Sequence, residues 1–258
     1  MRLLLLLAAL PAWGADDANA ILQRYIDAGS RNREIAAQYT YVERIDHFFF
    51  DKKGNATKDW SETHDVIFVE GLQYKRLVAR NDKPLDAREA AKEDKRLRRT
   101  AAERRKQRQS GLFHKTVSLG SDRDLLTMFD NRLLGEEEVR GRKAWVIEST
   151  PQAGRAPANQ HEKDVLSWRK KLWIDQADYV ALKSLDTVVG EHIVFKPGTT
   201  VAWEYEKINQ DVWLAVSGAL DGRAEFARLI KPRIRTSYRN SNFQKFDVQS
   251  TITIDEVK

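Results

Sequence analysis

Alternation of apolar and polar residues with a period of two is the pattern that most constrains this chain. In residues 40–49, Tyr41, Ile45 and Phe49 fall on one side, and the residues between them include several that are polar. This period is typical of strands whose two faces meet different surroundings. Similar segments are separated by turn sequences near residues 51–55, 71, 140–142, 176–178 and 208–211. Because these connections have hairpin spacing, the sequence predicts sequential antiparallel strands rather than a doubly wound α/β fold.

Two segments depart from the strand period and are predicted to be helices. The first begins near Asp16 and Asp17, which are suited to cap a helix, and extends to about Tyr39. The second covers residues 86–109, which are rich in strong helix formers. The predicted fold is therefore α+β but mainly β. It is a large curved antiparallel sheet, a half-barrel of about ten strands, with an N-terminal helix and a helical insertion covering its concave face.

The two faces of this sheet are expected to differ in chemistry. Trp203 and Tyr205 share one face of their strand, and Glu204 and Glu206 share the other. The apolar face carries more surface than one long helix and a small insertion can cover, so a hydrophobic hollow is expected. A closed barrel filled by its own side chains is the alternative, and the sequence leaves it open.

The C-terminal segment is predicted to form one more hairpin. Its strands are expected at residues 230–238 and 243–254. Asn240, Ser241 and Asn242 are the residues expected to form the turn between them.

The first residues resemble a secretory leader. A positive start at Met1 and Arg2 precedes an apolar run at residues 3–10, and small residues at 12 and 14 flank Trp13. Cleavage is expected before Ala15, which leaves a single exported domain of residues 15–258. In a Gram-negative host its compartment is the periplasm, and an uncleaved N-terminal anchor is the alternative. The chain has no Cys, which excludes disulfides, cysteine zinc sites, thiol nucleophiles and lipid attachment through an N-terminal Cys.

The positive charge of the chain is concentrated in residues 86–109. The formal net charge is +6, and this segment carries ten Lys or Arg side chains against five acids. Contact with an anionic membrane surface would use such a cluster of cations. A solvated helix held by salt bridges, such as Glu89 with Lys92, is the alternative. Nucleic acid is not expected as a partner, because no groove-reading motif or interleaved aromatic residue accompanies the charge.

No pattern of catalytic residues is found in the sequence. The chain lacks His-Glu-x-x-His, a phosphate-binding glycine loop and a nucleophile elbow. Ser167 and Lys170 match Ser-x-x-Lys without the companion motifs of penicillin-binding enzymes. His47 and His64 could meet across neighbouring strands, but solvated histidines are the commoner outcome. We therefore predict a protein that is not an enzyme, with no metal site and no cofactor.

The order of these segments resembles the outer-membrane lipoprotein-sorting proteins of the LolA superfamily. A leader and one amphipathic helix precede a long antiparallel meander. Within the meander, the resemblance lies in a Gly-x-Glu-x-x-x-Gly hairpin with its following strand at residues 135–147, Leu-Trp-Ile-Asp at 172–175 and Tyr-Val-Ala-Leu-Lys at 179–183. The charged insertion at 86–109 departs from the pattern, as does the polar strand end at 186–190.

The resemblance implies a carrier that holds the acyl chains of a lipoprotein, or another lipid, in the concave apolar face of the half-barrel. A non-enzymatic envelope-stress sensor or scaffold of the RseB type is the alternative. Burial of acyl chains stabilises such a complex by about 0.8 kcal/mol per methylene, so a carrier needs no catalytic group. The lipid-binding residues are predicted at alternate apolar positions of central strands, namely Phe68, Trp145, Ile147, Leu182, Trp203, Tyr205, Leu214 and Val216.

Overall fold

The computed structural model describes residues 15–51, 53–109, 122–224 and 232–246. The predicted leader therefore lies outside the described residues. Among the described residues, no helix is both long enough and apolar enough to cross a membrane. The helices are α1 (Ala15–Ala36), α2 (Ala87–Gln109), α3 (Asp124–Met128) and α4 (Gln160–Val165).

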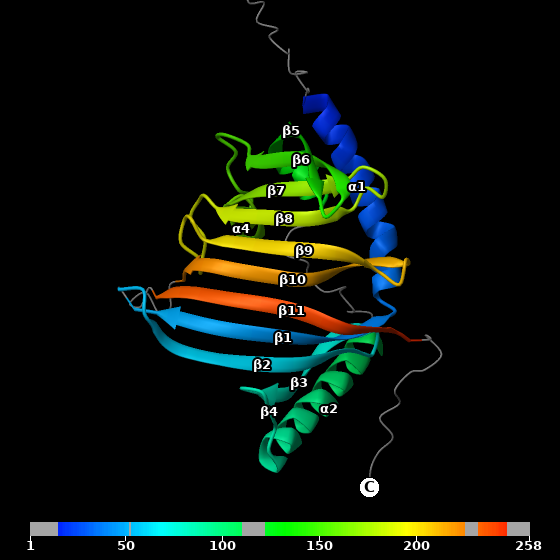
Figure 1. The fold of residues 1–258 in the computed structure, drawn as a ribbon, viewed down its shortest axis with the longest axis vertical. Coiled ribbons are helices and arrows are strands. Elements are labelled where there is room, and N and C mark those ends of the chain that lie inside the picture. The colour runs from blue at the N-terminus through cyan, green and yellow to red at the C-terminus, as the bar shows by residue number, and fades with distance from the viewer. Residues whose placement is uncertain (1–14, 52, 110–121, 225–231, 247–258) are drawn as a thin grey trace, which may run out of the picture.

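The strands form one antiparallel sheet, as the sequence predicts (Figure 1). They are β1 (Tyr39–Phe50), β2 (Ala56–Val69), β3 (Leu72–Arg80), β4 (Lys83–Pro84), β5 (Phe129–Val139), β6 (Arg142–Pro151), β7 (Trp168–Asp175), β8 (Ala181–Val188), β9 (Thr200–Ile208), β10 (Val212–Arg223) and β11 (Arg233–Lys245). The sheet has 11 strands in the order β4-β3-β2-β1-β11-β10-β9-β8-β7-β6-β5. It is not closed, because β4 and β5 lie at opposite edges.

The strand order joins two meanders in the middle of the sheet. Strands β1 to β4 form one meander, and β5 to β11 form the other. The chain crosses from one edge to the other between β4 and β5, a connection that includes α2 and α3. The pairing of β1 with β11 then brings the first and the last strand of the described residues side by side, as Figure 1 shows.

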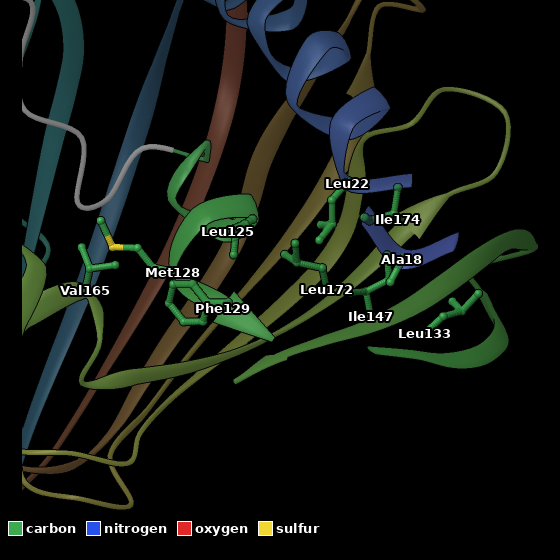
Figure 2. Packing of buried hydrophobic residues seen from close by; sticks show 10 residues of the cluster. All are labelled: Ala18, Leu22, Leu125, Met128, Phe129, Leu133, Ile147, Val165, Leu172 and Ile174. Carbon is green, nitrogen blue, oxygen red and sulfur yellow. The ribbon is translucent and has the colours of Figure 1, made fainter. Parts of the chain in front are cut away.

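Helix α1 covers the β5 end of one sheet face, which we call the α1 face. Ala18 and Leu22 are fully buried against Leu133, Ile147 and Leu172 of three adjacent strands. Figure 2 shows these side chains meeting between the helix and the sheet. Every second residue of a strand lies on the α1 face, and residues paired across neighbouring strands lie on the same face. Trp203, Tyr238 and the odd-numbered residues of β1 therefore also belong to the α1 face.

Helix α2 packs on the opposite face, which we call the α2 face. Its Leu97 and Ala101 contact Ile67, Val69 and Tyr74 of β2 and β3. Val66 of β2 pairs with Tyr41 and lies on the α1 face. Its neighbour Ile67 points to the other face, and Tyr74, which pairs with Ile67, lies there too. The half-barrel class is confirmed, but the two helices that were expected to cover one concave face lie on opposite faces and at opposite ends of the sheet.

The prediction of a C-terminal hairpin with a turn at residues 240–242 is wrong. Residues 240–242 lie inside the single strand β11 and form no turn between strands. Asn240 pairs with Glu43 and donates through Nδ2 to the carbonyl of Ala215, at 2.9 Å. A bulge in β11 opposite Tyr41 accommodates the positive φ of Asn242, 54°. Neighbouring strands on both sides thus give the polar run backbone partners that turn propensity did not anticipate.

Candidate functional site

The α1 face carries a group of aromatic side chains on the part of the sheet beyond α1. We call this group the aromatic strip, and it consists of Tyr41, His47, Phe49, Trp60, Phe68, Trp203, Tyr238 and Phe243. Every member is half-buried. The rings of His47 and Trp60 are stacked with centroids 4.6 Å apart, and Phe49 lies 5.5 Å from Trp60. At the other end of β1, Tyr41 lies 5.5 Å from Phe243. Strands β1, β2, β9 and β11 therefore place these rings on one face in separate contacts, with Glu43 and Ile45 of β1 between Tyr41 and His47.

Burial makes the surroundings of the strip unfavourable to charge. It raises the pKa of Tyr41 to about 12, with Glu43 adding to the shift, and it also raises the pKa of Tyr238. Burial lowers the pKa of His47 and His64, against the opposing effect of Glu62. Both histidines are therefore neutral at pH 7, as the contact of a ring with an apolar ligand requires. The buried carboxylate of Glu43 is paired with Lys75, at 2.7 Å.

Trp203 lies at the β9 end of the strip, where Gly218 leaves room for it. The two residues are paired across β9 and β10. A Cβ atom at position 218 would lie 2.5 Å from Cε3 of the indole, so the ring rests on the backbone of β10. The ring also contacts Tyr238, with centroids 5.1 Å apart. Glycine at this position thus determines where the indole lies.

We expect Gly218→Ala to destabilise the protein by about 1–3 kcal/mol, because the added methyl group overlaps the indole. Denaturant unfolding of the single variant and of the double variant with Trp203→Ala measures this coupling. In the Trp203→Ala background the cost of Gly218→Ala is expected to fall close to zero. An equal cost in both backgrounds would mean that the indole does not limit this position.

The predicted lipid-binding residues divide between the strip and the core. Phe68 and Trp203 belong to the strip, and Tyr205 follows Trp203 on the same face. Ile147 is fully buried under α1. Trp145 also packs against that core, with its ring 5.2 Å from Tyr179.

Three further predicted residues depart from simple alternation or lie on the other face. Leu182 is 2% exposed and is the extra residue of a bulge in β8. Val216 is the extra residue of a bulge in β10. Leu214 pairs with Glu206 and therefore lies on the α2 face. A bulge inverts the alternation of every residue beyond it, and sequence parity cannot detect one.

Sequence reasoning missed most of the strip. Phe49, Trp60, Tyr238 and Phe243 were not predicted as site residues, although Tyr41 and Phe49 are assigned to one face by alternation. The reason is the pairing of β1 with β11, which joins segments about 190 residues apart in the chain. The clearest available signal was the run of three phenylalanines at 48–50.

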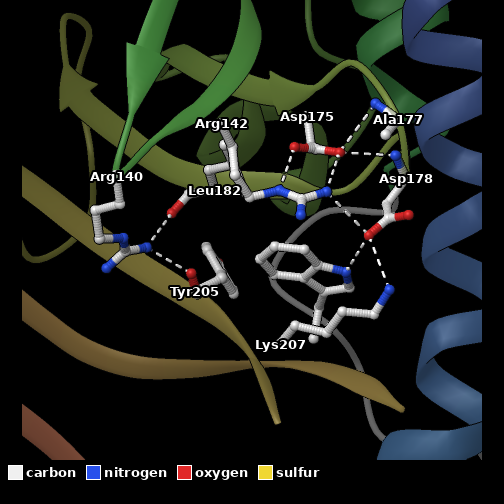
Figure 3. A network of polar contacts seen from close by, with 9 residues as sticks. Arg140, Arg142, Asp175, Ala177, Asp178, Leu182, Tyr205 and Lys207 are labelled. Atoms are coloured by element: carbon white, nitrogen blue, oxygen red, sulfur yellow. Dashed lines mark hydrogen bonds and ion pairs between the residues drawn. The ribbon is translucent and has the colours of Figure 1, made fainter. Parts of the chain in front are cut away.

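A network of polar contacts joins the strands next to the buried residues under α1 (Figure 3). The guanidinium of Arg142 donates two hydrogen bonds to the carboxylate of Asp175, at 2.7 and 2.8 Å. Asp178 accepts hydrogen bonds from Arg142, Lys207 and the indole of Trp213. These contacts link the β6, β7, β9 and β10 strands and include no nucleophile. The network therefore positions the sheet that carries the site.

The residues considered for catalysis have structural partners. Ser167 is 2% exposed and donates to the carbonyl of Asp164 at 2.6 Å. Lys170 is paired with Asp186, at 3.1 Å. His47 lies opposite Trp60 and His64 lies opposite Glu43, so the two histidines are not paired. Over the described part of the chain, no group of three or more His, Asp or Glu side chains is placed to hold a metal ion.

Two cavities are formed by described residues, and neither overlies the aromatic strip. One, of about 200 Å³, lies between β3 and α2 and is lined by residues such as Val78, Leu85 and Ala90. The other, of about 390 Å³, lies at the Arg142–Asp175 network. The apolar surface of the strip consists of half-buried rings.

Comparison with known proteins gives matches in fold. No family model matches the sequence, and no curated protein matches it. A domain assigned to outer membrane lipoprotein sorting in Vibrio parahaemolyticus is 12% identical, with 90% of this chain and 93% of that chain covered and a TM-score of 0.41. A LolA superfamily protein from Nitrosomonas europaea is 9% identical, with 90% and 94% covered and a TM-score of 0.34. The MucA/MucB complex of Pseudomonas aeruginosa matches at 12% identity, with 90% and 99% covered and a TM-score of 0.26.

Proposed function

We propose that the protein is a non-enzymatic periplasmic carrier that holds the acyl chains of a lipoprotein or another lipid against the aromatic strip. The observation that carries the proposal is the set of half-buried rings that β2, β1, β11 and β9 place on one face of the sheet. An acyl chain laid along these rings removes apolar surface of both partners from water, and no bond has to be made or broken.

The chemistry of the strip suits a neutral, apolar guest. The raised pKa of Tyr41 and Tyr238 and the lowered pKa of His47 follow mainly from burial, so the rings that contact the guest carry no charge at neutral pH. The β5 end of the same face is filled by the core under α1. The guest therefore binds between Trp203 and the rings of β2.

Trp203→Glu tests the proposal. The variant places a charge at the β9 end of the strip, in contact with the proposed guest, and we expect it to carry about tenfold less lipid than the wild type. The lipid is measured by mass spectrometry of extracts from protein purified from a Gram-negative host, and by uptake of a fluorescent lipopeptide from vesicles.

Ala219→Glu is the matched control, since it adds the same group to an exposed position of the α2 face. It is expected to retain lipid and uptake. Equal loading of Trp203→Glu and wild type would show that the strip is not the binding surface. Wild-type protein that contains no acyl species and takes none up would rule out the carrier.

The filled core under α1 favours one second candidate, an envelope sensor or scaffold of the RseB type. Such a protein needs no vacant interior, because its function is to hold a protein partner. A stable complex with an envelope protein, unaffected by Trp203→Glu, is the result expected of a scaffold. Lipid loading that depends on Trp203 is the result expected of a carrier.

A further inference from the structure

The outer side of α2 carries a line of cations, which we call the cationic stripe. Its members are Arg88, Lys92, Lys95, Arg99 and Lys106, all of them exposed. They are separated by four, three, four and seven residues, the spacing that keeps side chains on one side of a helix. From first to last the stripe extends about 27 Å along the helix. Large apolar side chains do not interrupt it.

Three of the four acids of α2 are used in contacts with the sheet, and the fourth, Glu103, lies on the stripe beside Arg99. Glu89 is paired with Arg80 of β3, and Asp94 with Arg76, both at 3.0 Å. Glu93 is buried and accepts a hydrogen bond from the hydroxyl of Tyr74, at 2.8 Å. These pairings replace the Glu89–Lys92 bridge considered from the sequence. As a result, the negative charge of the helix is neutralised on its inner side.

Apart from Arg98, which is exposed and has no ion-pair or hydrogen-bond partner in the described part of the chain, the other cations of α2 have structural partners. Arg104 donates to the backbone carbonyls of Val69, Leu72 and Gln73, and Arg105 pairs with Glu70 at 2.9 Å. In the stripe, Arg99 lies 3.6 Å from Glu103. The remaining four stripe residues have no ion-pair or hydrogen-bond partner among the residues that the structure describes. The stripe is thus the part of the positive charge that the fold leaves available.

The shape of this surface fits a plane. Helix α2 is held by Leu97, Ala101 and Arg104 against β2 and β3, so only its outer half is exposed. A straight line of cations on the outer half can contact a flat anionic surface along its full length.

We propose that the cationic stripe docks the protein on the surface of a bilayer containing anionic phospholipid, with α2 parallel to the membrane plane. Attraction of each cation to the headgroups contributes about fivefold in binding, so five aligned cations suffice for measurable association. Since the stripe offers only cations and alanines, the helix stays at the level of the headgroups. The proposal does not depend on lipid carriage in the aromatic strip.

Vesicle co-sedimentation of the full chain tests this docking. The vesicles are phosphatidylcholine alone, or phosphatidylcholine with about one third phosphatidylglycerol. We expect binding to the anionic vesicles and none to the neutral ones. The triple variant Lys92→Gln, Lys95→Gln and Lys106→Gln should lower the partition coefficient about 100-fold. Salt at about 1 M, where the Debye length is about 3 Å, should abolish wild-type binding.

The matched control is the triple variant Arg31→Gln, Lys143→Gln and Arg239→Gln. It removes the same charge from exposed positions outside α2 whose side chains have no ion-pair or hydrogen-bond partner in the part of the chain that the structure describes, and its binding is expected to stay within about threefold of the wild type. Equal losses in the two triple variants would overturn the proposal in favour of attraction by net charge. Binding that survives high salt would overturn it too, as would binding to heparin without binding to anionic vesicles. Lipid loading of the stripe variant reports on the aromatic strip separately.

Discussion

Asp175→Ala is expected to lower the free energy of unfolding by about 3 kcal/mol, measured by urea denaturation. The side chain of Asp175 is 1% exposed and accepts the two hydrogen bonds from Arg142. One of its oxygens also accepts from the backbone N–H groups of Ala177 and Asp178, at 3.0 and 2.7 Å. Removing the carboxylate leaves these donors without their acceptor. The value lies at the low end for a broken buried pair because the Arg142 side chain is 39% exposed.

The same carboxylate makes stability depend on pH. Burial alone would raise the pKa of Asp175, but hydrogen bonds from Arg142 and the backbone outweigh it and hold the pKa below its usual range. Because the folded pKa lies below the unfolded value, the contribution is present above about pH 4 and is lost as the pH falls through the folded pKa. In Asp175→Asn the unfolding free energy should therefore vary less with pH in the acid range.

Asp130→Ala is the control for both measurements, since Asp130 is exposed on β5. It should change stability by no more than about 0.5 kcal/mol. A similar loss in the two alanine variants would show that the Arg142–Asp175 network does not stabilise the sheet.

Leu22→Ala is expected to cost about 3 kcal/mol, because the leucine is fully buried between α1 and the sheet. Its removal leaves a cavity among Leu133, Ile147 and Leu172, and a cavity at this position weakens the attachment of α1. The cost is measured by urea denaturation, and hydrogen exchange of the α1 amides should increase along with it.

Gln23→Ala is the matched control one position along the same helix. Gln23 is exposed, and its side chain contacts Asp27 at 3.2 Å. We expect little change in stability and in α1 exchange. Should Leu22→Ala unfold at the same urea concentration as the control, α1 would not be held by the cluster in Figure 2.

Local sequence patterns predicted most helices and strands of this fold. They did not predict which strands distant in sequence pair with one another. Alternation and turn spacing identify the hairpins, such as β5–β6 around Gly141, because residues close in sequence determine them. The many helix-forming residues at 86–109 predict α2. The face on which α2 packs depends on how β3 is placed in the finished sheet, and no local signal reports that. The run at 240–242 was taken for a turn because Asn and Ser favour turns when no neighbouring strand is considered.

Prediction of the candidate site was limited in the same way. Trp203 and Tyr205 were placed on one face correctly, since their strand is regular there. Ile147 was chosen for its apolar side chain, but α1 covers it, and the sequence does not say how far a helix extends over a sheet. The rings of β1 and β2 became part of the site through the β1–β11 pairing. The exposed cations of α2 could be separated from the paired ones only through their contacts.

The central position of β1 and β11 has a consequence for the order of folding. Each meander can form from its own hairpins. The two meanders are joined by the pairing of β1 with β11, which can form only after β11 has been synthesised. Closing a loop of nearly two hundred residues is slow relative to hairpin formation. Until then β1 and β10 each have an edge of unpaired backbone N–H and C=O groups, which can pair with strands of other chains. A chaperone that masks these edges should therefore raise the yield of refolding more than one that stabilises the helices.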